Sequence, residues 1–146
     1  MHMLVKAKCY DALLIEGSGV AEPMPIAAGL ACYDVGRGKV LSEVLAMDTI
    51  VVVVDAVNFL RDYFSTEAVA SRPTMRGEAN GDAALTRSSV VELLIKQVEL
   101  ANVILLNKCA GLSLEDRARV EGILRTISPR ATLMVHDPQQ LADSRL

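Results

Sequence analysis

The chain has 146 residues, 51% of them hydrophobic, which is the content of one ordinary globular domain. Its net charge of -3, from 15 basic and 18 acidic residues, gives no basic face for a nucleic-acid backbone, so we expect no nucleic-acid partner. No apolar stretch approaches the roughly 20 residues needed to cross a bilayer, and residues 1–8 lack the apolar core of a signal peptide. We therefore expect a cytoplasmic protein with no membrane partner.

Three cysteines, Cys9, Cys32 and Cys109, stand far apart in the sequence. An odd number at these spacings neither builds a disulfide framework nor forms a Cys-x-x-Cys metal ligand pair. We expect reduced thiols.

Four short, continuous apolar runs predict strands at 12–15, 50–54, 103–106 and 132–135. Most are rich in branched residues, which is typical of strands buried on both faces. Between them, a capping-box pattern predicts a helix over 89–101. A second helix is expected over 114–127, before Pro129.

Buried strands that alternate with helices predict an α/β fold, a doubly wound and mostly parallel sheet with helices on both faces. Residues 64–87 form the one long irregular stretch, which in a compact domain is usually functional or disordered. Ligands of such sheets bind at the carboxyl ends of the strands.

Two polar motifs follow predicted strands. Glu16 comes directly after the first strand, and Gly19 follows three residues later. A carboxylate there can hold a metal-bound water, and a glycine lets a backbone N–H approach a phosphate. The same residues are also compatible with a Gly-rich turn that carries a solvated glutamate. Asn107 and Lys108 end the third strand, where either a base-binding role or a solvated strand end is possible.

The motifs together, in one order from Tyr10 to Val135, resemble the carboxyl-terminal part of the GTPase domain of the CobW-type P-loop GTPases. The segment 10–23 resembles the family's Glu-containing Walker B region, 48–59 its valine-aspartate-alanine strand, 86–108 its helix, strand and guanine-recognition element, and 128–131 its Asn-Pro-x-Ala.

The resemblance implies that residues 1–146 are a partial nucleotide-binding domain of the P-loop NTPase type, from the Walker B segment to the end of the GTPase domain. Members bind GTP with Mg²⁺, hydrolyse it slowly and deliver zinc or cobalt to a metalloprotein client. On that pattern Glu16 orders the magnesium and its water, Gly19 donates its amide to the γ-phosphate, and Asn107 with Lys108 flanks the guanine.

Three departures from the family pattern limit this expectation. No G-x-x-x-x-G-K-[ST] loop occurs in the 146 residues, and that loop supplies most phosphate contacts. The family's Cys-x-Cys-Cys motif is absent, since only Cys9 precedes Tyr10. The family's NKxD reads Asn107-Lys108-Cys109-Ala110, so the carboxylate that binds guanine is missing.

These observations predict a partial or truncated GTP-dependent metallochaperone that does not hydrolyse GTP by itself. The alternative is a non-catalytic interaction module that keeps the surface of the fold, pairing with a second chain that supplies the missing strands. The family places the P-loop strand between the 12–15 and 50–54 strands, so we expect those two strands either to pair directly or to pair with another copy.

Other polar residues have simpler interpretations. Asp55, at a strand end, either lines the nucleotide cleft or caps the turn before Asn58. His2 and His136 lack neighbours at ligand spacing and are expected to be exposed or terminal rather than zinc ligands. Scattered methionines are expected to be packing residues: Met24, Met47, Met75 and Met134.

Overall fold

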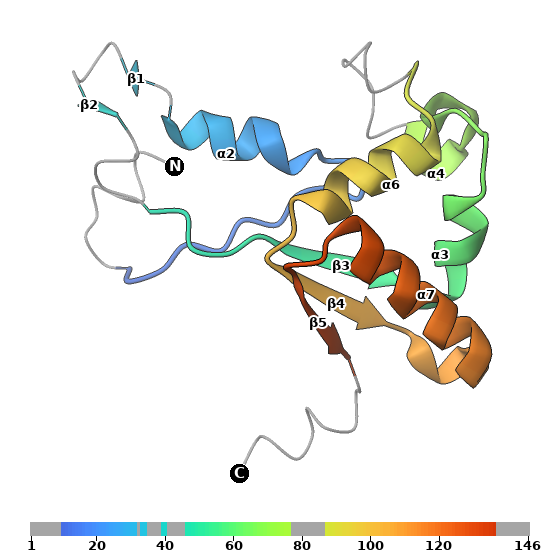
Figure 1. Cartoon of the computed structure of the whole chain (residues 1–146). Coiled ribbons are helices and arrows are strands. Elements are labelled where there is room, and N and C mark those ends of the chain that lie inside the picture. The colour runs from blue at the N-terminus through green and yellow to red at the C-terminus, as the bar shows by residue number, and fades with distance from the viewer. Residues whose placement is uncertain (1–9, 32, 35–38, 41–45, 77–86, 137–146) are drawn as a thin grey trace. The chain divides into compact units, whose positions relative to one another are not determined.

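The structure is a computed structural model that describes residues 10–31, 33–34, 39–40, 46–76 and 87–136 (Figure 1). The chain divides into two compact units, residues 1–48 and 49–146, and each is described by itself. In the first unit, helix α2 spans Pro23–Ala31. A proline suits the first helical position because the N–H it lacks would have no partner there. Strands β1 (Tyr33–Asp34) and β2 (Lys39–Val40) form a short antiparallel pair.

The predicted strand at 12–15 is wrong. These residues have no regular secondary structure, and the side chain of Leu14 is 93% exposed. A buried parallel strand needs neighbours for its N–H and C=O groups, and neither described sheet includes residues 12–15. The expected direct pairing with the 50–54 strand therefore does not form, whereas pairing with another copy stays a prediction.

A three-stranded parallel sheet organises the second unit. Strands β3 (Val51–Asp55), β4 (Val103–Asn107) and β5 (Thr132–Val135) lie in the order β3-β4-β5. Both strand pairs are parallel. The three strands match the predicted runs to within one residue, and the predicted α/β fold with a parallel sheet is confirmed.

Three helices connect and cover these strands: α3 (Ala56–Tyr63), α6 (Val90–Glu99) and α7 (Leu114–Ile127). The predicted capping box begins α6, because Ser89 Oγ accepts from the Glu92 N–H at 3.2 Å and the Glu92 carboxylate accepts from the Ser89 N–H at 3.4 Å. Ser113 caps α7 by accepting from the Asp116 N–H at 3.0 Å. Both predicted helices are thus confirmed, and polar caps fix where each begins.

The predicted irregular stretch contains local structure. A 3₁₀ turn, η2 (Val69–Ser71), and a short helix, α4 (Pro73–Arg76), lie in its described part. The Arg72 guanidinium pairs with Asp62 at 2.7 Å and with Glu67 at 2.8 Å, and its side chain is only 15% exposed. This paired cation links the end of α3 to the turn that follows it.

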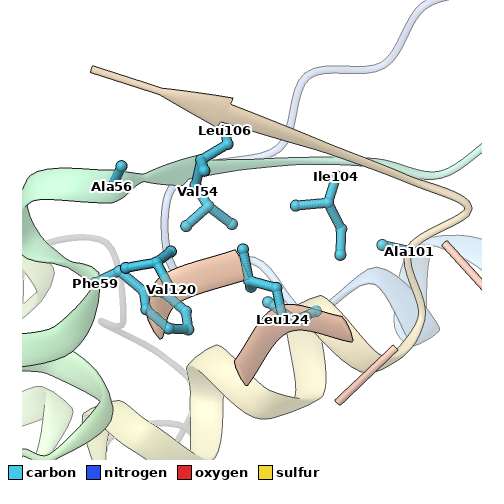
Figure 2. Close-up of a cluster of buried hydrophobic side chains, with 9 residues drawn as sticks. Val54, Ala56, Phe59, Ala101, Ile104, Leu106, Val120 and Leu124 are labelled. Atoms are coloured by element: carbon cyan, nitrogen blue, oxygen red, sulfur yellow. The ribbon is translucent and has the colours of Figure 1, made fainter. Parts of the chain in front are cut away.

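The hydrophobic core lies between the sheet and the helices of the second unit (Figure 2). Alternate strand residues point into it, as the two-residue period of a strand requires. The helices contribute Phe59, Val120 and Leu124 to the same cluster, and Phe59 stacks on Tyr63 with ring centroids 5.8 Å apart. The sheet contributes its most buried positions, Val54, Ile104 and Leu106.

Within the described part of the second unit, nothing covers the opposite face of the sheet. Val51, Val53 and Met134 alternate with the core positions and are more than half exposed. Burial on both faces, which the continuous apolar runs predicted, is therefore observed on one face. Within the described helices, none combines the length and apolar character needed to cross a membrane.

Candidate functional site

Polar side chains gather where the three parallel strands end. Asp55 is the last residue of β3 and lies opposite Asn107, the last residue of β4. His136 follows β5 and is held by its own N–H, which donates to the Leu106 carbonyl at 2.8 Å. Since the carboxyl ends of parallel strands share one edge of a sheet, these residues meet at the edge where such folds bind ligands.

The Asp55 carboxylate has four hydrogen-bond donors around it. Oδ1 accepts from the N–H groups of Val57, at 3.0 Å, and Asn58, at 3.2 Å, which caps helix α3. Oδ2 accepts from Asn58 Nδ2 at 2.8 Å and from Lys108 Nζ at 2.7 Å. Asp55 thus caps the helix, which confirms the capping alternative, and it also pairs with Lys108 at the strand ends. A place in a nucleotide cleft stays a prediction.

Burial alone would raise the pKa of Asp55. The hydrogen bonds from Lys108 and Asn58, with the positive charge of Lys108, outweigh it and lower the pKa below its ordinary value. The carboxylate is consequently charged at neutral pH and holds the lysine ammonium in place.

Lys108 has an unusual backbone. Its φ of 63° and ψ of 29° lie in the left-handed region, and no other described non-glycine residue has a positive φ. The Asn107 side-chain oxygen accepts from the Lys108 N–H at 2.8 Å, which supports this conformation locally. The chain then turns through η3 (Cys109–Gly111) toward α7.

His136 is a site residue that the sequence analysis missed. Its ring is half-buried, and Nδ1 lies 3.1 Å from Asn107 Oδ1, so the side chain is not exposed, which was one of the two expected positions. That it is not a zinc ligand stays a prediction. Its position directly after a predicted strand, at the same edge as Asn107, was the signal that could have identified it. The other histidine, His2, lies outside the described residues.

Glu16 and Gly19 belong to the first unit. Glu16 is exposed in a segment without regular structure, and Gly19 lies in a turn where the Ala21 N–H donates to the Ser18 carbonyl at 2.9 Å. A Cβ on Gly17 would lie 3.0 Å from the Cβ of Ala21, so a side chain at that neighbouring position would press against Ala21. Of the predicted site residues, the structure thus brings together Asn107 and Lys108, with Asp55 and His136 beside them.

The sequence resemblance implies a guanine nucleotide, and the strand-end residues carry some of the groups that its base end would need. Asn107 and Lys108 offer hydrogen-bond donors and a cation for the base end, although the exposed Ala110 in η3 supplies no carboxylate. The phosphate and magnesium end does not fit in the same way, because the sequence lacks the G-x-x-x-x-G-K-[ST] loop. Within residues 10–31, 33–34, 39–40, 46–76 and 87–136, no three His, Cys, Asp or Glu side chains gather to hold a metal ion.

Cys109 lies next to this cluster, and its thiol is expected to be unreactive. Burial raises the pKa of its thiol, and Sγ donates to the Leu106 carbonyl at 3.6 Å. A thiol that stays protonated is a poor nucleophile and a poor metal ligand. Cys9 and Cys32 lie outside the described residues.

Comparison with known proteins gives one family and one relative. The family model described as "CobW/HypB/UreG, nucleotide-binding domain" matches residues 1–135. The chain is similar to the zinc-regulated GTPase metalloprotein activator 1 of Dictyostelium discoideum, with 37% identity over 131 residues, which is 90% of this chain and 26% of that protein. The chain thus spans about a quarter of the length of this relative. No solved structure matches.

Proposed function

Because this chain belongs to the CobW/HypB/UreG family of nucleotide-binding domains, we propose that its strand-end cluster is the base-binding end of a GTP site in a metallochaperone. The observation that carries the proposal is the contact network of Asp55, Lys108 and Asn107 at the carboxyl ends of β3 and β4. It holds in place the two residues that the family resemblance assigns to the base.

The chemical roles follow from the geometry. Asn107 presents a side-chain amide at the edge of the sheet, and the ammonium of Lys108 beside it is held by Asp55. Such a pair recognises a flat, polar ring by hydrogen bonds at its edge and by packing on its face. Glu16 and Gly19 are proposed to act at the magnesium and γ-phosphate end.

GTP hydrolysis is not proposed for this 146-residue chain on its own. Phosphoryl transfer depends on positioning and on charge stabilisation by the phosphate-binding loop, and no sequence of that type is present. Glu16 by itself would leave the phosphates without the nest of amides and the lysine that hold them. We therefore derive no hydrolytic step from these residues.

The cargo is proposed to be zinc or cobalt, delivered to a metalloprotein client. The relative's name states zinc regulation and metalloprotein activation of that protein. The Cys-x-Cys-Cys motif expected for such cargo is absent from this sequence. We propose that tight metal binding, where it occurs, needs thiolates from outside these 146 residues.

GTP is expected to bind the chain no more tightly than roughly the millimolar range, because the chain has residues for the base of the nucleotide but lacks the phosphate-binding loop. Titrating GTP with Mg²⁺ into ¹⁵N-labelled protein, and following the amides of residues 107–111, measures affinities this weak. Asn107→Ala is the matched control and should remove the shifts. A micromolar dissociation constant for the wild-type chain would contradict the proposal.

Ala110→Asp is expected to raise the preference for guanine over adenine nucleotides about tenfold, since a charged, bidentate hydrogen bond contributes about 1.5–3 kcal/mol. It is not expected to produce any hydrolysis, because base recognition cannot replace phosphate positioning. Comparing GMP and AMP affinities tests the first point, and phosphate release tests the second. Ala110→Asn adds similar bulk without charge and should gain less. Turnover above a buffer control in the aspartate variant would show that the missing part has been misjudged.

The alternative function, a non-catalytic interaction module, is favoured by one observation. The face of the sheet that carries Val51, Val53 and Met134 is apolar and open among the described residues, and such patches often mark surfaces for a partner. A module of this kind would show no specific shifts at residues 107–111 with any nucleotide, so the GTP titration separates the two functions.

A further inference from the structure

A single hydrogen bond fixes which way the side-chain amide of Asn107 faces. Asn107 Oδ1 lies 2.8 Å from the backbone nitrogen of Lys108. A backbone N–H is always a donor, so the atom opposite it must be the amide oxygen rather than the amide nitrogen. The orientation of an asparagine amide is often ambiguous, but here the main chain of the next residue determines it.

The same oxygen determines where His136 carries its proton. His136 Nδ1 lies 3.1 Å from Asn107 Oδ1, and an amide oxygen can only accept. A hydrogen bond between them therefore requires a hydrogen on Nδ1. A neutral imidazole has one N–H, so Nε2 is then its acceptor nitrogen.

The ring is also well placed to act on Asn107. The backbone N–H of His136 donates to the Leu106 carbonyl at 2.8 Å, which continues the ladder between β4 and β5. His136 thus stands at a fixed position one strand away from Asn107. With the proton on Nδ1, the Lys108 N–H and the His136 Nδ1–H both donate to Oδ1, and the Asn107 amide then cannot rotate without losing two hydrogen bonds.

We propose that His136 is a positioning residue for ligand recognition, which locks the Asn107 amide so that its Nδ2 hydrogens face a bound purine nucleotide. This inference rests on the proposed base-binding role of Asn107. The N7 nitrogen of the five-membered ring is an acceptor that guanine and adenine share and that pyrimidines lack, so an amide locked toward it selects purines as a class. Discrimination between the two purines is then left to position 110.

The tautomer of His136 tests the lock directly. Long-range ¹H–¹⁵N spectra of the 146-residue chain, recorded with the histidines neutral, should show the proton on Nδ1 of His136. In Asn107→Ala, with the acceptor removed, the proton should shift to Nε2, the usual site in a free imidazole. His2 is the internal control and should give the same spectrum in both proteins. A wild-type His136 protonated at Nε2 alone would overturn the inference.

Nucleotide affinity tests the consequence for recognition. In GMP titrations, His136→Phe should weaken binding about fivefold, the effect of losing one net hydrogen bond. His136→Asn keeps an N–H donor near the place of Nδ1 and should stay within about twofold of wild type. Equal affinities for wild type and His136→Phe would refute the positioning role. Absence of GMP binding by the wild type would refute the proposed function, and the tautomer measurement would still decide whether the amide is locked.

Discussion

Phe59→Ala is expected to lower the free energy of unfolding by about 3–5 kcal/mol, the largest effect of any single substitution considered for this chain. Phe59 is 2% exposed and lies in the core cluster between the sheet and helices α3 and α7. Truncating it removes buried apolar area and leaves a cavity that the packed strands and helices cannot close. It also removes the stacked partner of Tyr63.

The chain contains its own matched control for this substitution. Its only other phenylalanine, Phe64, is 65% exposed and touches Tyr63 edge-on. Phe64→Ala should therefore change the stability by less than about 1 kcal/mol. Urea unfolding followed by circular dichroism measures both variants under one set of conditions. Similar losses for the two variants would mean that the core does not lie where the structure places it.

Asp55→Ala is expected to destabilise the chain by about 2 kcal/mol at neutral pH. The substitution removes the side-chain cap of α3, and such caps contribute about 0.5–2 kcal/mol. It also leaves the Lys108 ammonium without its carboxylate partner. Chemical denaturation measures the loss. Ser113→Ala is the matched control, because it removes the cap of α7 without touching an ion pair.

The pH dependence separates the charge of Asp55 from its capping role. The folded-state pKa of Asp55 lies below its ordinary value, so the unfolded chain takes up the proton first as the pH falls. The stability that the charge contributes is therefore complete above about pH 4, the ordinary pKa of an aspartate, and is lost as the pH falls through the lower folded value. Asp55→Asn should flatten the acid limb of the stability curve, and Ser113→Ala should leave it unchanged. An acid limb that is identical in wild type and Asp55→Asn would contradict the ion pair.

Local signals predicted most of the second unit. Each predicted strand is a short run of branched apolar residues, and each predicted helix begins at a serine whose hydroxyl caps it, so neither depends on distant parts of the chain. The prediction of a strand at 12–15 was wrong because the apolar run is typical of a buried strand, but it does not show whether neighbouring strands are present to pair with it. Val51 and Val53 show the same limit, since an apolar run does not indicate whether a second layer covers it.

The site was predicted in part, for the same reason. Asn107 and Lys108 stand in a recognisable motif, which identified them. Asp55 and His136 are brought to these residues by strand register, one from β3 and one from the end of β5. Strand register and the helices that connect the strands decide which strand ends lie side by side. The identity of a single residue does not show which strand end it will lie beside. Whether a lone histidine is a ligand, a surface group or a positioning group depends on that geometry.

The left-handed backbone at Lys108 sets the stability of the fold against the proposed base-binding role at one residue. Any L-amino acid with a side chain loses about 1–2 kcal/mol in this conformation, whereas glycine adopts it freely. Selection for stability alone would favour glycine at position 108. If Lys108 binds the base as proposed, its side chain serves a purpose other than stability, and the ion pair with Asp55 offsets part of the strain. Replacing Lys108 with glycine to stabilise the domain would therefore also remove the cation from the strand-end cluster.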